Sequence, residues 1–120
     1  MVNFNPNEPI YLQLMNRIIG EIVRGQRKAG EKLPSVREYA VDVGVNVNTI
    51  QRVYRELEYE AIVETKRGQG TFVTSNSERL ETLRDDKKRE IVHHFMKNMQ
   101  EMGYNKEEMV MSIKLQGDEE

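Results

Sequence analysis

The 120-residue sequence contains no cysteine. Disulfide bonds, thiolate catalysis and cysteine-ligated zinc are therefore excluded. Long apolar runs are absent as well, and none approaches the roughly 20 residues that a membrane-spanning helix needs. Residues 1–6 have neither a basic flank nor an apolar core, so they do not indicate an export signal. These absences lead us to expect a protein of the cytoplasm with no membrane partner.

A strong net charge is also lacking, since the chain carries a formal charge of −2. Residues 1–74 hold 10 Lys/Arg and 9 Asp/Glu, whereas residues 75–120 hold 8 and 11. The front part is thus barely basic and the acidity lies in the tail. Any affinity for nucleic acid must come from a local basic face and not from a global field.

Apolar residues at helical spacing predict two helices in the first part of the chain. The first spans residues 10–26, with Leu14, Ile18 and Ile22 on one side. The second is short and begins after Ser35, which can form a capping box with Glu38. Gly44 is expected to end it.

A third helix is predicted from residues 46–48 to about residue 60. At about 100° per residue, Ile50, Val53, Tyr54 and Leu57 fall on one face. The opposite face carries Asn48, Gln51, Arg52 and Arg55, with no carboxylate among the four. Amides and guanidinium groups can hydrogen-bond to base edges and phosphates.

Two β-branched stretches, residues 62–66 and 71–74, predict short strands. The Arg67-Gly68-Gln69-Gly70 segment between them suits a tight hairpin with positive φ angles. Lys66 and Arg67 place positive charge at its tip. The order helix, helix, turn, helix, hairpin predicts a mainly α fold with a small two-stranded β-wing, a winged helix-turn-helix.

Beyond a hinge at residues 75–77, the pattern predicts a long helix over about residues 78–102 and a final short helix. We expect residues 1–75 to form the DNA-binding domain and residues 76–120 a helical tail. Two helices alone cannot build an independent core, so their apolar stripe either folds back on the winged domain or pairs with a second copy. We favour pairing, through a set that consists of Ile91, Val92, Phe95, Met99, Met102, Met109 and Ile113.

Several ordered motifs resemble the DNA-binding signature of the GntR family. They are residues 9–14 (PIYLQL), 30–38 (GEKLPSVRE), 44–50 (GVNVNTI) and 67–73 (RGQGTFV). The Val-Asn-x-Asn-Thr run and the short tail are most similar to the YtrA subgroup, in which two C-terminal helices replace a large effector domain. The resemblance implies a homodimeric transcription regulator, most simply a repressor, on a palindromic operator.

The resemblance also assigns roles to individual residues. It implies DNA contact from Ser35 and Arg37 at the second helix, from the start of the third helix, and from the hairpin. At the start of the third helix these residues are Asn46, Asn48, Thr49, Gln51 and Arg52. In the hairpin they are Arg67, Gly68 and Gly70. Side-chain geometry suits Gln51 to adenine and Arg52 to guanine, without assigning bases. Two positions depart from the pattern, because Val47 replaces a frequent base reader and Ala61 replaces a frequent helix-ending glycine.

Other functions receive less support. His93 and His94 follow Asp86 and Glu90 at helical spacing, but nothing else indicates a metal site, so we expect no metal and no cofactor. No serine, histidine and acid set is in recognisable order, which argues against an enzyme. The main alternative is a winged helix that binds proteins and no operator. A small-molecule effector at the dimer interface, or between tail and winged domain, stays open.

Overall fold

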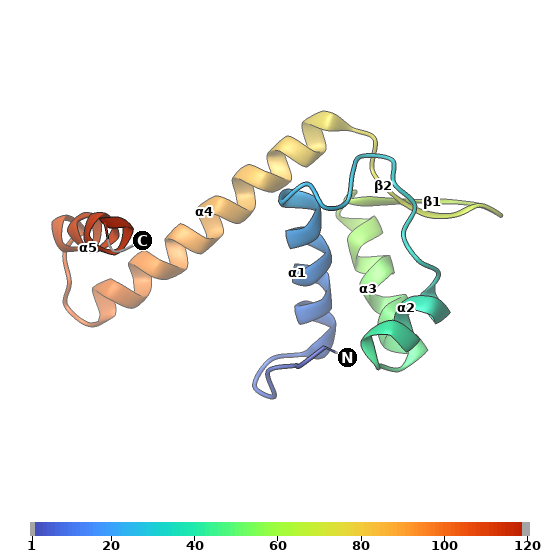
Figure 1. Ribbon diagram of the computed structural model, residues 1–120, viewed down its shortest axis with the longest axis horizontal. Helices are drawn as coiled ribbons and strands as arrows, with labels where there is room; N and C mark the ends of the chain where they lie inside the picture. The colour runs from blue at the N-terminus through green and yellow to red at the C-terminus, as the bar shows by residue number, and fades with distance from the viewer. Residues whose placement is uncertain (1, 119–120) are drawn as a thin grey trace. The chain divides into compact units, whose positions relative to one another are not determined.

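The computed structural model describes residues 2–118 and divides into two compact units, residues 1–83 and 84–120. The first unit holds three helices and a hairpin, and the second holds most of a long helix and a final helix (Figure 1). The predicted mainly helical fold with a two-stranded wing is confirmed.

Helix α1 spans Ile10–Val23 and provides one wall of the core. Leu14, Ile18 and Ile22 are buried, as their spacing predicts. The helix ends three residues before the predicted boundary, because the chain turns at Gly25, whose φ of 81° is in the left-handed region.

Helix α2 spans Val36–Val43 and begins with the predicted capping box. The backbone N–H of Glu38 donates to Ser35 Oγ over 3.1 Å, and the N–H of Ser35 donates to Glu38 Oε1 over 3.0 Å. Gly44 ends the helix with a φ of 76°. These two ends fix a short helix that packs against α3.

Helix α3 spans Val47–Tyr59, and its buried residues are the four predicted ones, Ile50, Val53, Tyr54 and Leu57. Its C-terminus is closed by two hydrogen bonds, from Ala61 N–H to the Glu58 carbonyl and from Ile62 N–H to the Leu57 carbonyl, both 2.9 Å. This is a Schellman motif, which requires a left-handed residue after the C-cap. Ala61 takes that conformation with a φ of 59°, the one non-glycine residue with positive φ in the described part of the chain.

The wing consists of β1, Val63–Lys66, and β2, Gly70–Val73, paired antiparallel with Glu64 opposite Phe72. Residues 30–33 run along the other edge of β2. Leu33 N–H donates to the Thr71 carbonyl and Val73 N–H to the Glu31 carbonyl, both over 2.8 Å. The sequence did not predict that residues 30–33 pair with β2, which brings Lys32 opposite Phe72.

Helix α4 spans Ser77–Glu101, and its first turns belong to the first unit. Leu83 is buried in the core with Leu80 packed against it, and Arg79 Nε donates to the Glu60 carbonyl over 2.9 Å. Whereas the predicted functional boundary follows residue 75, the compact units meet after Leu83. Helix α5 spans Lys106–Asp118 and opens with a second capping box, formed by Asn105 and Glu108.

Candidate nucleic-acid interface

The outer face of α3 is polar and open to solvent. Asn48, Gln51, Arg52 and Arg55 are all exposed, whereas the opposite face is buried in the core. The buried face fixes the rotation of the helix, so the amide and guanidinium groups must point outward. Such a face can donate to and accept from base edges in a major groove.

Two predicted contact residues also cap helices. Asn46 Oδ1 accepts from the backbone N–H of Asn48 over 2.7 Å and so begins α3, while Ser35 begins α2. Their acceptor oxygens are engaged in these caps, and the Ser35 hydroxyl also interacts with the Glu38 carboxylate, whereas Asn46 Nδ2 remains as a donor. Asn46 therefore presents a side-chain donor at the N-terminus of α3. At the N-termini of both helices, backbone N–H groups and the helix dipole favour phosphate.

The start of α3 is less exposed than the helix centre. Thr49 is half-buried, and Val47 is half-buried and packs against the core. Val47 thus has a packing role, which fits its departure from the family pattern. Arg37, the second residue of α2, is exposed.

The hairpin carries the other predicted contacts. Arg67 and Gly68 are exposed at its tip, and Gly68 and Gly70 have φ angles of 77° and 122°. A Cβ on Gly70 would lie 2.9 Å from Cε of Lys32, whose side chain crosses the strand there. Lys66 lies 4.7 Å from the centroid of the Phe72 ring. Sequence reasoning missed Lys32, because only the pairing of residues 30–33 with β2 brings it to the wing.

Cations on these surfaces form no ion pairs within the described residues. Within residues 2–118, the ion pairs involve Arg27, Lys87 and Arg89, which lie elsewhere. Six basic side chains lie on α2, on the outer face of α3 and at the wing, and in the same described range none of them forms an ion pair. They are Lys32, Arg37, Arg52, Arg55, Lys66 and Arg67. Their charges remain available to phosphates, although the front part of the chain is almost neutral overall.

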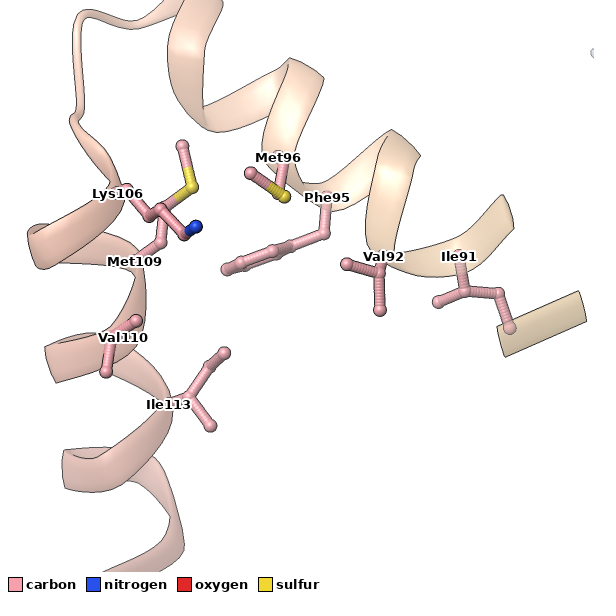
Figure 2. A pocket seen from close by; sticks show the side chains of 8 residues that line it. All are labelled: Ile91, Val92, Phe95, Met96, Lys106, Met109, Val110 and Ile113. Carbon is pink, nitrogen blue, oxygen red and sulfur yellow. The ribbon is translucent and has the colours of Figure 1, made fainter. Parts of the chain in front are cut away.

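A second exposed surface lies in the second unit and is apolar. Ile91, Val92 and Phe95 of α4 face Met109 and Ile113 of α5 across a cavity of about 430 Å³ (Figure 2). Of the predicted interface set, Ile91, Val92, Met102 and Ile113 are exposed, Phe95 and Met99 are half-buried, and Met109 is buried. The prediction omitted four further exposed residues, which are Tyr104, Val110, Met111 and Leu115.

The histidines do not belong to a ligand cluster. His93 and His94 are exposed, with ring centroids 6.0 Å apart. In the described part of the chain, no group of three or more histidine, aspartate or glutamate side chains is placed to hold a metal ion. The same part contains no helix with the length and hydropathy needed to cross a membrane.

Residues 10–73, which hold the three helices and the hairpin, match the model of the family described as "Bacterial regulatory proteins, gntR family". The chain belongs to the GntR family. The HTH-type transcriptional regulator YhcF of Bacillus subtilis, itself uncharacterized, is 49% identical over 111 residues, 92% of each chain. The HTH-type transcriptional repressor YtrA of the same organism is 42% identical over 79 residues, 64% of this chain and 61% of YtrA. The predicted family and its YtrA-like character are confirmed.

Solved structures agree with this assignment. A GntR family transcriptional regulator from Listeria monocytogenes has a TM-score of 0.88 and 41% identity, and the match covers 92% of this chain and 97% of that one. The DNA-binding domain of AraR in complex with operator ORX1 has a TM-score of 0.56 and 26% identity, covering 61% and 93%. The protein is therefore a transcription regulator with a DNA-binding winged helix-turn-helix, and not an enzyme.

Proposed function

We propose that this GntR-family protein is a homodimeric repressor that binds a palindromic operator. Helix α3 enters the major groove, and the wing residues 67–70 lie alongside. The observation that carries the proposal is the exposed face of α3, where Asn48, Gln51, Arg52 and Arg55 stand opposite a fully buried face. Since the target is chromosomal DNA, the protein acts in the cytoplasm.

Base reading and backbone binding are divided between different residues. Gln51 and Asn48 carry amides, which can pair bidentately with adenine in the major groove. Arg37 at the N-terminus of α2 and Arg67 at the wing tip are suited to phosphates, because neither has an acidic partner within residues 2–118. The solved complex of the AraR DNA-binding domain with operator ORX1, a neighbour in fold, supports operator binding by this domain.

Homodimerisation is supported by the apolar surface of α4 and α5. Ile91 and Ile113, which line the same cavity, are 68% and 60% exposed, and such an apolar patch is costly in water. A second copy offers the same surface, so a two-fold interface would bury both at once. Two recognition helices would then read half-sites about 10 base pairs apart, or a multiple of that spacing.

Repression follows most simply from occupancy of a promoter, and the name of the relative YtrA as a repressor supports this choice. A small effector that binds at the dimer interface, or between tail and winged domain, stays a prediction. It would act by changing the spacing of the two recognition helices, and hence the affinity for the operator.

The decisive experiment selects binding sites from random duplex DNA with the full-length protein and titrates the recovered site at several salt concentrations. We expect a two-fold symmetric site. Gln51→Ala should lose about 1–3 kcal/mol and relax specificity at one base pair in each half-site. Arg37→Ala should weaken binding to all sequences and lower the salt slope by about 1 for each phosphate that the protein no longer neutralises.

Arg24→Ala is the matched control for Arg37→Ala. Arg24 is exposed at the C-terminal end of α1, and among the interactions of the described residues its side chain hydrogen-bonds only to Gln26. This variant removes the same charge away from the proposed interface, so its affinity should stay near that of the wild type. Equal losses from Arg37→Ala and Arg24→Ala, or a failure to enrich any site, would refute operator binding by this face.

A further inference from the structure

Arg52 stacks on an aromatic ring from another helix. Its guanidinium carbon lies 3.5 Å from the centroid of the Tyr11 ring, a distance typical of a close cation–π stack. Tyr11 is the second residue of α1, and Arg52 lies near the middle of α3. The two helices pack against each other, so the stack joins the proposed reading face to its scaffold.

The Tyr11 ring is held by packing against the core, and the loop before its helix is held by Gln13. Tyr11 is half-buried and packs against the hydrophobic core. Near it, Gln13 ties the preceding loop to α1, since its Nε2 donates to the carbonyls of Asn5 and Glu8 over 2.8 and 2.9 Å. Tyr11 is therefore a fixed platform, while Arg52 is an exposed side chain resting on it.

No carboxylate competes for Arg52, because it forms no ion pair within residues 2–118. Stacking covers one face of the planar guanidinium and leaves the N–H groups at its edge free to donate. The stack thus restrains the side chain without using the donors that DNA would need. A free arginine must lose most of its rotamer freedom on binding, and a stacked one has already lost part of it.

We infer that Tyr11 is a positioning residue for Arg52 in DNA binding. Tyr11 holds the guanidinium over its ring before DNA arrives and so lowers the entropic cost of the arginine contact. This inference rests on the proposed function, since it presumes that Arg52 touches the operator. It goes beyond that function by assigning a role in recognition to a residue outside the second and third helices and the wing.

The test is a double-mutant cycle on the full-length protein and its selected operator, measured by fluorescence anisotropy at several salt concentrations. The variants are Tyr11→Leu, Tyr11→Phe, Arg52→Ala and the Tyr11→Leu/Arg52→Ala pair. We expect Tyr11→Leu to weaken binding roughly two- to tenfold, the equivalent of one immobilised side chain. Tyr11→Phe keeps the ring and should change affinity by less than about twofold.

Two readouts separate positioning from a general loss of structure. Once Arg52 is absent, Tyr11→Leu should cause no further loss of affinity. Tyr11→Leu should also shift the salt slope or the base preference in the same direction as Arg52→Ala, which mere destabilisation would not do. Thermal melting of each variant confirms that the protein is folded at the temperature of the titration.

The failures of the two proposals are distinguishable. If Arg52→Ala weakens binding but Tyr11→Leu binds as well as the wild type or more tightly, this inference is wrong and the proposed function stands. The inference is also wrong if Tyr11→Leu is equally harmful with and without Arg52. If the wild type selects a site and Arg52→Ala binds that site equally well, the inference alone is overturned. If the wild type selects no site, both proposals are overturned.

Discussion

Tyr54 of α3 donates its phenolic hydrogen to the carbonyl oxygen of Pro34 over 2.7 Å. Pro34 comes just before the capping residue of α2, so this bond joins the proposed reading helix to the start of its neighbour. Burial raises the pKa of Tyr54 above its ordinary value of 10, which keeps the hydroxyl protonated and able to donate. The loop before α2 is thus joined to α3 by a side-chain hydrogen bond, in addition to the apolar packing between the two helices.

Replacing Tyr54 with phenylalanine should remove this bond and little else. The ring still packs near Tyr39, 6.2 Å away, but the Pro34 carbonyl loses its partner. We expect a loss of about 1 kcal/mol in the free energy of unfolding. Urea titration should show a lower midpoint with an unchanged slope. Tyr59→Phe is the control, because Tyr59 is 88% exposed, and equal losses from both variants would contradict the prediction.

Replacing Ala61 with glycine, which is frequent at this helix-ending position in the family pattern, should stabilise the protein. Its φ of 59° costs an L-residue roughly 1 kcal/mol, a strain that glycine does not have. The greater entropy of glycine in the unfolded chain offsets part of this gain, so Ala61→Gly should raise the free energy of unfolding by about 0.5 kcal/mol. Thermal or chemical denaturation will measure the change.

Ala29→Gly provides a control of opposite sign. Ala29 lies in an exposed turn, and its φ is not positive. Glycine there gains only unfolded-state freedom, so the variant should lose about 0.4–1 kcal/mol. If both substitutions destabilise the protein, the strain assigned to Ala61 is absent.

The two wing glycines should differ in their tolerance of alanine. Gly68 has a φ of 77° with open space where a Cβ would stand, whereas Gly70 has a φ of 122° and meets the Lys32 side chain. We expect Gly68→Ala to lower the free energy of unfolding by about 1 kcal/mol and Gly70→Ala to lower it by about 2–3 kcal/mol. The reason is the strain of an L-residue in a backbone conformation that favours glycine. Melting temperatures and operator affinities should both rank the variants in this order, and the reverse order would count against the assigned strain.

These positions show where sequence reasoning succeeded and where it could not. The capping box of Ser35 and Glu38 and the buried face of α3 were predictable, because both depend on spacing within a few residues. Lys32 and Tyr11 were not, since the first reaches the wing only through the added edge beside β2 and the second reaches Arg52 only by helix packing. Likewise, the first turns of α4 pack on the core of the first unit through Leu83, and no local sequence pattern predicts that Leu83 is buried.

Acid should weaken the start of α2. Hydrogen bonds from the backbone N–H and the hydroxyl of Ser35 hold the pKa of Glu38 below 4.5, and Lys32 adds a smaller effect in the same direction. A lowered folded-state pKa means that the stabilisation is complete above the unfolded value and is lost as the pH falls through 4.5 and below.

Glu38→Gln isolates this effect, because its amide oxygen can still accept from Ser35 but cannot titrate. The stability advantage of the wild type over Glu38→Gln should be largest near pH 7 and should shrink toward pH 3. Thermal melting of both proteins across this range measures the difference. An advantage that stays constant with pH would show that the charge of Glu38 has no part in the cap.

A charge on the apolar face of α4 should separate the proposed dimer. Ile91 is 68% exposed in the single chain, so Ile91→Glu should leave the fold intact. Buried against a second copy, the new carboxylate would be unpaired, and self-association should weaken at least about 100-fold. A point substitution is preferable to removing α4, because Leu80 and Leu83 belong to the core of the first unit.

Analytical ultracentrifugation over a concentration series tests this prediction, with Gln100→Glu as the control. Gln100 is an exposed residue of the same helix about 130° from the centre of the apolar stripe, at 100° per residue, so it adds the same charge without entering the interface. Ile91→Glu should sediment as a monomer and lose affinity for the two-half-site operator while keeping its weak binding to one half-site. A dimer that survives Ile91→Glu would instead place the self-association surface away from this face of α4.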